Sequence, residues 1–336
     1  MSLRSNGDIT RRSALAVLTS AGCWAASGLP LFASDSMADN LNKLLPNFSE
    51  NSRALLQRLL SDANYSGQIQ AADVSTLAKN ENINTEKLML SLIPLAQGYS
   101  QAPISNFHVG VLVRGASGSL YTGANIEIPG QCLGFAVHAE QSALSNAYMH
   151  AEQSVDALAV GGAPCGHCRQ FINEMSPDGE IVILIPEKPP AKLNDILPAA
   201  FGPAALGMKK GALPVPHTAL SLSDAGGANP LVLAALDAAQ RSYAPYSKSP
   251  SGLAIRSAKG RIYKGSYIEN VAFNPSLSPL QTALAAMIAA GEPYSAISHV
   301  ALVESKGAKI SQKNVTETVM AAIAPTVKLQ VANAVR

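Results

Sequence analysis

Two short segments contain the residues whose types and spacing could carry out chemistry. The first is Val137-His138-Ala139-Glu140-Gln141, and the second, residues 163–170, contains Cys165 and Cys168. One imidazole and two thiolates are three ligands of the kind that zinc takes in a tetrahedral site, and the fourth position then remains for water. A structural zinc normally has four protein ligands, so the pattern predicts a catalytic ion. A lone C-x-x-C could also be redox-active or structural, but the His and Glu upstream favour the catalytic interpretation.

Glu140 is the expected proton carrier. It lies two residues after His138 and can approach the metal without binding it. Zinc lowers the pKa of a bound water from about 15.7 to roughly 7, and a carboxylate beside it can take the released proton and return it to the substrate. Such positioned acid–base help is worth about 100- to 10,000-fold in rate. For Arg169, directly after Cys168, two roles stay open: tuning the charge of the thiolates, or packing.

The elements expected to position these residues are helices and strands in alternation. A helical run extends from His138 to His150, and a second helix opens at Pro164. Both ligand groups therefore lie at helix beginnings, where amide groups and the helix dipole favour thiolates. Strands are expected at residues 109–113, with a hairpin partner at 120–121, and at 157–160 and 181–185. This alternation predicts an α/β layered domain with both faces of its sheet covered.

The C-terminal third repeats the order of the catalytic segment. The matches are Ala102-Pro103-Ile104-Ser105 with Ala244-Pro245-Tyr246-Ser247, Gly123-Ala124-Asn125-Ile126-Glu127 with Gly265-Ser266-Tyr267-Ile268-Glu269, and Gln141-Ser142-Ala143-Leu144 with Gln281-Thr282-Ala283-Leu284. Three ordered matches favour duplication over chance. Ser278 and Leu280 stand where the first copy has His138 and Glu140, and no cysteine follows Cys168. The second copy therefore cannot assemble the same zinc site.

These observations divide the chain. Residues 40–97 carry leucines at helical spacing, with Asn84-Thr85-Glu86 as a helix start, which predicts helices with a packing role. We expect a leader at 1–37, a small helical domain at 38–84, a catalytic zinc domain at 85–205, a linker at 206–221 and a degenerate, non-catalytic copy at 222–336.

Composition and the N-terminal segment limit the partners. The 336 residues carry a formal net charge of +2 and are 47% hydrophobic and 5% aromatic, which describes a globular chain without the basic patch of a nucleic-acid binder. Arg11-Arg12 precede an uncharged stretch from Ala14 to Ala33, as in a twin-arginine export signal. Translation could instead begin near Met37. Two glycines and a proline weaken the stretch as a membrane-spanning helix, so no stable membrane insertion is expected.

The motifs of this sequence resemble those of the two-domain, homodimeric bacterial cytidine deaminases. They are Ser105-Asn106-Phe107, Gly123-Ala124-Asn125-Ile126-Glu127, Pro164-Cys165-Gly166-His167-Cys168-Arg169-Gln170-Phe171 and Tyr246-Ser247-Lys248-Ser249-Pro250-Ser251-Gly252. His-x-Glu followed by Pro-Cys-x-x-Cys is the known signature of zinc deaminases. The resemblance implies a three-layer α/β/α cytidine deaminase-like fold, present twice, and hydrolytic deamination of cytidine and 2'-deoxycytidine to uridine and 2'-deoxyuridine, a step of pyrimidine salvage.

The resemblance also implies partners and residue roles. It implies one Zn²⁺ per chain, a nucleoside substrate, a homodimer whose second copy helps close the partner's pocket, and a cytoplasmic location, with the periplasm as the alternative through Arg11-Arg12. The implied roles are zinc binding by His138, Cys165 and Cys168, proton shuttling by Glu140, stacking on the pyrimidine by Phe107, and contacts to the ribose by Asn125, Ile126 and Glu127. A carboxylate near the ribose disfavours a phosphate and hence favours nucleosides over nucleotides. Gly162 departs from the family, where an aromatic residue is expected.

Two other functions remain open at this stage. A deaminase that acts on a flipped base in single-stranded DNA or RNA would need a basic, aromatic-rich groove, which the near-neutral charge and the few aromatic residues do not favour. A zinc-stabilised nucleoside-binding protein without turnover is disfavoured by Glu140 and by the absence of a fourth ligand in the motif.

Overall fold

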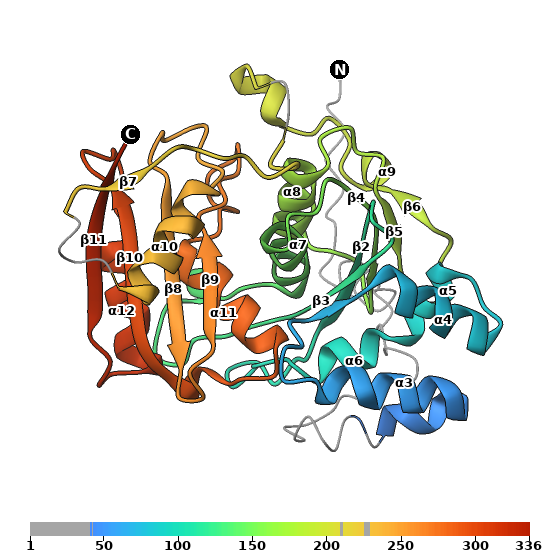
Figure 1. Ribbon diagram of the computed structural model, residues 1–336. Helices are drawn as coiled ribbons and strands as arrows, with labels where there is room; N and C mark the ends of the chain where they lie inside the picture. The colour runs from blue at the N-terminus through green and yellow to red at the C-terminus, as the bar shows by residue number, and fades with distance from the viewer. Residues whose placement is uncertain (1–40, 42, 209–210, 225–228) are drawn as a thin grey trace, which may run out of the picture. The chain divides into compact units, whose positions relative to one another are not determined.

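The computed structural model describes residues 41, 43–208, 211–224 and 229–336 of the chain (Figure 1). The leader predicted at 1–37, with its paired arginines, lies outside these residues. Within the described ranges, no helix combines the length and the apolar character needed to cross a membrane.

The elements follow one another as helices (α), short 3-10 helices (η) and strands (β). In chain order they are η1 (Leu45–Asn47), α3 (Glu50–Ser61), β1 (Gln68–Ile69), α4 (Ala71–Glu81), α5 (Thr85–Ser91), α6 (Ile93–Gln97), β2 (Gly110–Gly115), β3 (Leu120–Ala124), η2 (Leu133–Phe135), α7 (Ala139–Met149), β4 (Val155–Val160), α8 (Gly166–Met175), β5 (Val182–Leu184), β6 (Ala191–Lys192), α9 (Leu193–Ile196), η3 (Pro203–Leu206), β7 (Ser221–Leu222), α10 (Pro230–Gln240), β8 (Ser251–Ser257), β9 (Ile262–Ser266), α11 (Pro279–Ala289), η5 (Tyr294–Ala296), β10 (Ile297–Ser305), α12 (Lys313–Ile323) and β11 (Leu329–Val335).

Two sheets with the same arrangement of four core strands, β3-β2-β4-β5 and β9-β8-β10-β11, confirm the repeat. The first has the strand order β1-β3-β2-β4-β5-β6 and the second β7-β11-β10-β8-β9. In each, a hairpin (β2–β3 or β8–β9) is followed by an antiparallel neighbour and then by a parallel strand. The first copy, from α6 to β5, and the second copy, from α10 to β11, therefore share the order helix, hairpin, helix, strand, helix, strand. The predicted duplicated α/β fold is confirmed.

Glycines show which helices cover which face of each sheet. A Cβ on Gly110 would lie 2.3 Å from the backbone of α6, and a Cβ on Gly123 would lie 2.1 Å from the backbone of α7. Gly123 pairs with Val111, the residue next to Gly110. Because neighbouring strand residues point to opposite faces, α6 and α7 cover opposite faces, so the first copy has three layers.

The second copy has the same three layers. A Cβ on Gly252 would lie 2.1 Å from the backbone of α10, and a Cβ on Gly265, which pairs with the next residue of β8, would lie 2.1 Å from that of α11. Helices α7 and α11 pack against each other. The first turn of each helix also makes a hydrogen bond to the other copy. The side-chain amide of Gln141 donates to the Pro275 carbonyl (2.9 Å), and that of Gln281 donates to the Phe135 carbonyl (3.2 Å).

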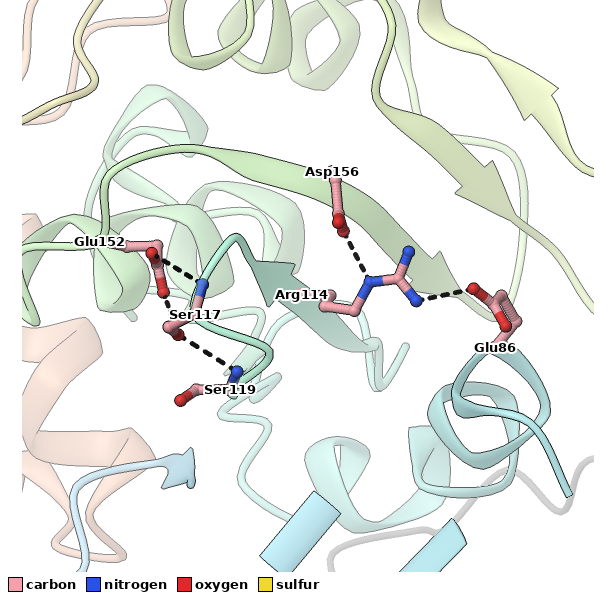
Figure 2. A network of polar contacts seen from close by, with 6 residues as sticks. All are labelled: Glu86, Arg114, Ser117, Ser119, Glu152 and Asp156. Carbon is pink, nitrogen blue, oxygen red and sulfur yellow. Dashed lines mark hydrogen bonds and ion pairs between the residues drawn. The ribbon is translucent and has the colours of Figure 1, made fainter. Parts of the chain in front are cut away.

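The segment before the first copy is largely helical, as expected. Asn84 begins α5, and its side chain accepts a hydrogen bond from the Lys87 amide at 2.9 Å. Figure 2 shows that Arg114 on β2 joins this helix to the sheet, with ion pairs of 2.6 Å to Glu86 and to Asp156. The sequence did not predict β1, which pairs antiparallel with β3, because two residues are too short for a visible alternation.

A buried carboxylate holds the turn between β2 and β3. Glu152 accepts hydrogen bonds from the hydroxyls of Ser117 (2.6 Å) and Tyr121 (2.9 Å). Figure 2 shows the contact between Glu152 and Ser117, together with the Ser119 amide that donates to the Ser117 hydroxyl. Glu152 is 4% exposed. This network stabilises the end of the hairpin that lies away from the metal-ligating motif.

Candidate metal and active site

The three predicted zinc ligands lie together. His138 Nδ1 is 3.2 Å from Cys168 Sγ and 3.5 Å from Cys165 Sγ, and the two sulfurs are 3.5 Å apart. Zinc bonds of about 2.3 Å to sulfur and about 2.0–2.1 Å to nitrogen at tetrahedral angles require separations of about 3.8 Å between sulfurs and about 3.6 Å between sulfur and nitrogen. The observed distances lie within a few tenths of an ångström of these values, so the donor set fits a tetrahedral zinc ion.

The ligands come from the first turns of α7 and α8, as the sequence predicted. His138 is the N-terminal cap of α7. Cys165 caps α8, and its sulfur accepts a hydrogen bond from the Cys168 amide at 3.4 Å. Both sulfurs therefore lie at a helix end whose unpaired amides and dipole interact favourably with negative charge. The sequence predicts a helix that opens at Pro164, whereas α8 begins at Gly166 and Pro164 precedes the cap, because the Cys165 side chain takes the capping position.

Glu140 lies in the first turn of α7, 6% exposed, beside the ligands. Burial raises the pKa of the Cys168 thiol well above its ordinary value, and the negative charges of Glu140 and Cys165 raise it further. A divalent cation at these ligand atoms would reverse the balance, because it attracts the negative groups that otherwise repel one another. The Glu140 carboxylate thus lies close enough to the ligand set to interact with the Cys168 thiol.

The predicted nucleoside-binding residues lie on the adjoining segment. Ile126 is fully buried and exchanges backbone hydrogen bonds with Val137, the residue before His138. This pairing places the segment 125–127 next to the start of α7. Phe107 is 59% exposed, so its ring is available for stacking and is not part of the core.

The side chains of Asn125 and Glu127 bind the chain's own loop, a role that the sequence did not reveal. Asn125 accepts from the Val109 amide (2.9 Å) and donates to the Phe107 carbonyl (2.8 Å). Glu127 accepts from the amides of Ile104 (2.8 Å) and Ser105 (3.0 Å) and from the Ser105 hydroxyl. Both residues therefore fix the loop that carries Phe107, and their contacts to a ribose remain a prediction.

Electrostatics at Glu127 agree with this loop-holding role. Burial acts to raise the pKa of Glu127, but hydrogen bonds from the Ser105 hydroxyl and from the two amides outweigh it, and the net pKa lies below the ordinary value. The second copy retains the arrangement: Glu269 accepts from the amides of Tyr246 (2.7 Å) and Ser247 (3.2 Å). The repeat was the signal that could have revealed it, because Glu127 and Glu269 recur at matching positions.

Arg169 contacts backbone carbonyls. Its Nε donates to the Pro164 carbonyl (2.8 Å) and its Nη1 to the Ile196 carbonyl (2.7 Å). These contacts support the packing role among the two interpretations. Arg169 therefore joins the residue before Cys165 to the last residue of α9.

Comparisons with known proteins agree with the geometry. A family model described as "Cytidine and deoxycytidylate deaminase zinc-binding region" matches residues 83–185, and a second model of the same description matches residues 193–317. The chain is similar to a cytidine deaminase of Vibrio vulnificus (strain YJ016), 42% identical over 272 residues that cover 81% of this chain and 91% of that protein. It is also similar to a cytidine deaminase of Aliivibrio fischeri (strain ATCC 700601 / ES114), 38% identical over 298 residues that cover 88% of this chain and 99% of that protein.

Proposed function

The chain belongs to the cytidine and deoxycytidylate deaminase family, and we propose that it hydrolyses cytidine and 2'-deoxycytidine to uridine and 2'-deoxyuridine in pyrimidine salvage. The observation that carries this proposal is the convergence of His138, Cys165 and Cys168 on one point beside the buried carboxylate of Glu140. These three side chains would hold one zinc ion per chain.

In the proposed reaction, Glu140 would transfer the protons of a water activated by the metal. Zinc, when bound, supplies the Lewis acidity that makes a coordinated water acidic near neutral pH. The Glu140 carboxylate takes a proton from the attacking water and delivers it to the ring nitrogen N3. It then assists the departure of the amino group as ammonia, so one water is consumed for each ammonia released. Its burial in the first turn of α7 keeps the carboxylate next to the ligands.

The substrate proposed for this site is a free nucleoside. Phe107 would stack on the pyrimidine, while Asn125 and Glu127 would hold the ribose hydroxyls, with Ile126 between them. In that case both polar side chains serve the ribose and the loop together. A 5'-nucleotide or a nucleic acid fits less well, because the Glu127 carboxylate would repel a nearby phosphate.

We further propose a homodimer. Large apolar side chains are exposed on segments next to the site and at the matching place of the second copy, namely Phe107 (59%), Leu133 (73%) and Phe273 (65%). Apolar surface of this kind favours a covering partner. Light scattering should give twice the mass of one chain, and a monomer mass at assay concentration would contradict the proposal.

The location proposed for the enzyme is the cytoplasm, where a nucleoside salvage reaction would take place, and the periplasm is the alternative if Arg11-Arg12 direct export. Mass determination of the mature N-terminus from fractionated cells separates the two. Recovery of the protein from the periplasm with a cleaved leader would contradict the cytoplasmic proposal.

The activity is tested by the loss of cytidine absorbance with purified protein, compared with an oligonucleotide that contains the same base. We expect turnover of cytidine alone. Glu140→Gln should keep zinc and lose at least about 100-fold in kcat, whereas Glu180→Gln, which removes an exposed ion pair to Lys192, should remain active. Full activity of Glu140→Gln, or turnover of the oligonucleotide alone, would contradict the proposal.

A further inference from the structure

A buried carboxylate on the metal-bearing helix is bound entirely by the second copy. Glu174 lies in the last turn of α8, six residues after Cys168, and has no exposed surface. Its Oε1 accepts hydrogen bonds from the hydroxyls of Tyr243 (2.7 Å) and Tyr246 (2.6 Å), and its Oε2 accepts one from the Val271 amide (2.8 Å). Because a buried carboxylate is costly unless it is hydrogen-bonded, these three donors make the position of α8 depend on the second copy.

A second contact fixes α8 one turn earlier. The Asn270 side-chain amide donates to the Gln170 carbonyl at 3.0 Å. Gln170 follows Cys168 by two residues, and Gln170 and Glu174 are four residues apart, so they lie on one face of the helix. A helix held at two successive turns on one face cannot rotate or slide without breaking these contacts. We call the four residues Tyr243, Tyr246, Asn270 and Val271 the α8 socket.

The α8 socket stands where the first copy has its predicted nucleoside-binding segments. Tyr246 occupies the repeat position of Ile104 in the loop fixed by the carboxylate, and Glu269 occupies that of Glu127. Asn270 and Val271 follow Glu269 directly. In the first copy, the loop and the segment after it are proposed to receive a substrate. In the second copy, the same pair of segments receives Glu174 of α8.

We propose that Glu174 is a positioning residue through which the metal-free copy holds the start of α8, and with it Cys165 and Cys168, in the ligand geometry. The second copy thus acts on the active site of its own chain, in addition to any role across a dimer. The inference rests on the proposed metal site, since the geometry that it protects is that of the two thiolates and His138.

Glu174→Gln tests the proposal, with Glu152→Gln as the matched control. Both carboxylates are buried and accept hydrogen bonds from a tyrosine hydroxyl and from backbone amides, but Glu152 holds the β2–β3 turn. Glutamine at position 174 keeps the side-chain volume, but its NH2 group is a donor and must face one of the donors that Glu174 accepts from. Cobalt(II) replaces zinc in the assay because its absorption bands report tetrahedral thiolate ligation. The rate of metal loss to a chelator, kcat, KM and urea unfolding are measured on the same proteins.

We expect Glu174→Gln to shift the cobalt bands, to speed metal loss about tenfold and to lower kcat more than it changes KM. Glu152→Gln should lower stability but keep the wild-type bands and rate of metal loss. If the two variants behave alike, the inference is wrong while the proposed function stands. A wild-type protein that binds no cobalt would instead refute the metal site. Should Glu174→Gln fail to fold, Tyr246→Phe removes one donor only and should change the bands and the metal loss in the same direction by less.

Discussion

Replacement of Gly123 by alanine should reduce catalysis without touching a catalytic residue. A Cβ at this position would lie 2.1 Å from the Ala143 amide nitrogen and 2.7 Å from the Ala139 carbonyl oxygen, both in the backbone of α7. No side chain can turn away to relieve the overlap, so the helix itself must move. To pass from 2.1 Å to an ordinary contact of 3.4 Å, α7 must shift by about 1.3 Å relative to β3.

The magnitude follows from what α7 carries. Its first turn holds His138 and Glu140, and a misplacement of about 1 Å at a reacting group can cost about 100-fold in rate. Overpacking of this kind also costs about 1–3 kcal/mol of stability. We therefore expect Gly123→Ala to fold with a lower free energy of unfolding and to lose about two orders of magnitude in kcat, measured by the loss of cytidine absorbance.

Gly252→Ala is the matched control. Its Cβ would lie 2.1 Å from the Ala239 amide nitrogen of α10, an equal overlap on the sheet face opposite to α11. It should cost similar stability by urea unfolding and keep kcat within a few-fold of wild type. If Gly123→Ala keeps wild-type kcat, or if Gly252→Ala loses as much activity, the argument that α7 sets the catalytic geometry is refuted.

Two further predictions concern the first copy away from the ligands. Burial lowers the pKa of His150, whose ring nitrogens contact the Asn146 carbonyl and the Ser66 hydroxyl. As the pH falls below about 6.5, the unfolded chain therefore binds a proton at this residue before the folded chain does, and the free energy of unfolding should decrease. The decrease with pH should be less steep in His150→Gln, and equal slopes of unfolding free energy against pH, measured by urea unfolding, would contradict this. Arg114→Met removes two partly exposed ion pairs, so it should lower the free energy of unfolding by at most about 1 kcal/mol per pair and leave kcat unchanged. A large loss of activity would contradict this and would show that α5 and β4 influence the site.

The sequence was sufficient for the chemistry because the ligands lie close together in the chain and begin helices. His138 and Glu140 share the first turn of α7, and Cys165 and Cys168 share that of α8, so local spacing carried most of the geometry. The repeat was also visible, because Gly123 and Gly265 must both be glycine to admit a helix. A close approach of a helix to a strand thus requires one residue type at one position, which can be recognised in the sequence.

Contacts between distant segments could not be predicted in the same way. Asn125 and Glu127 bind the loop at 104–109 mostly through backbone groups, which every residue has, and the Ser105 hydroxyl is the one side chain of that loop that donates to Glu127. Glu174 meets partners about 70 to 100 residues later in the chain. From sequence alone, Glu174 looks like an ordinary residue of an amphipathic helix. Only the packing of the two copies shows that it is buried.

Zinc content measured together with activity in Cys168→Ser and Cys132→Ser tests the central claim most directly, namely that one metal held by His138, Cys165 and Cys168 carries the reaction. Cys132 is an exposed free thiol outside the ligand set. We expect one zinc per chain and full deamination in the wild type and in Cys132→Ser, and the loss of both in Cys168→Ser. Retention of one zinc and wild-type activity by Cys168→Ser, or full activity of a metal-free wild type, would contradict the claim.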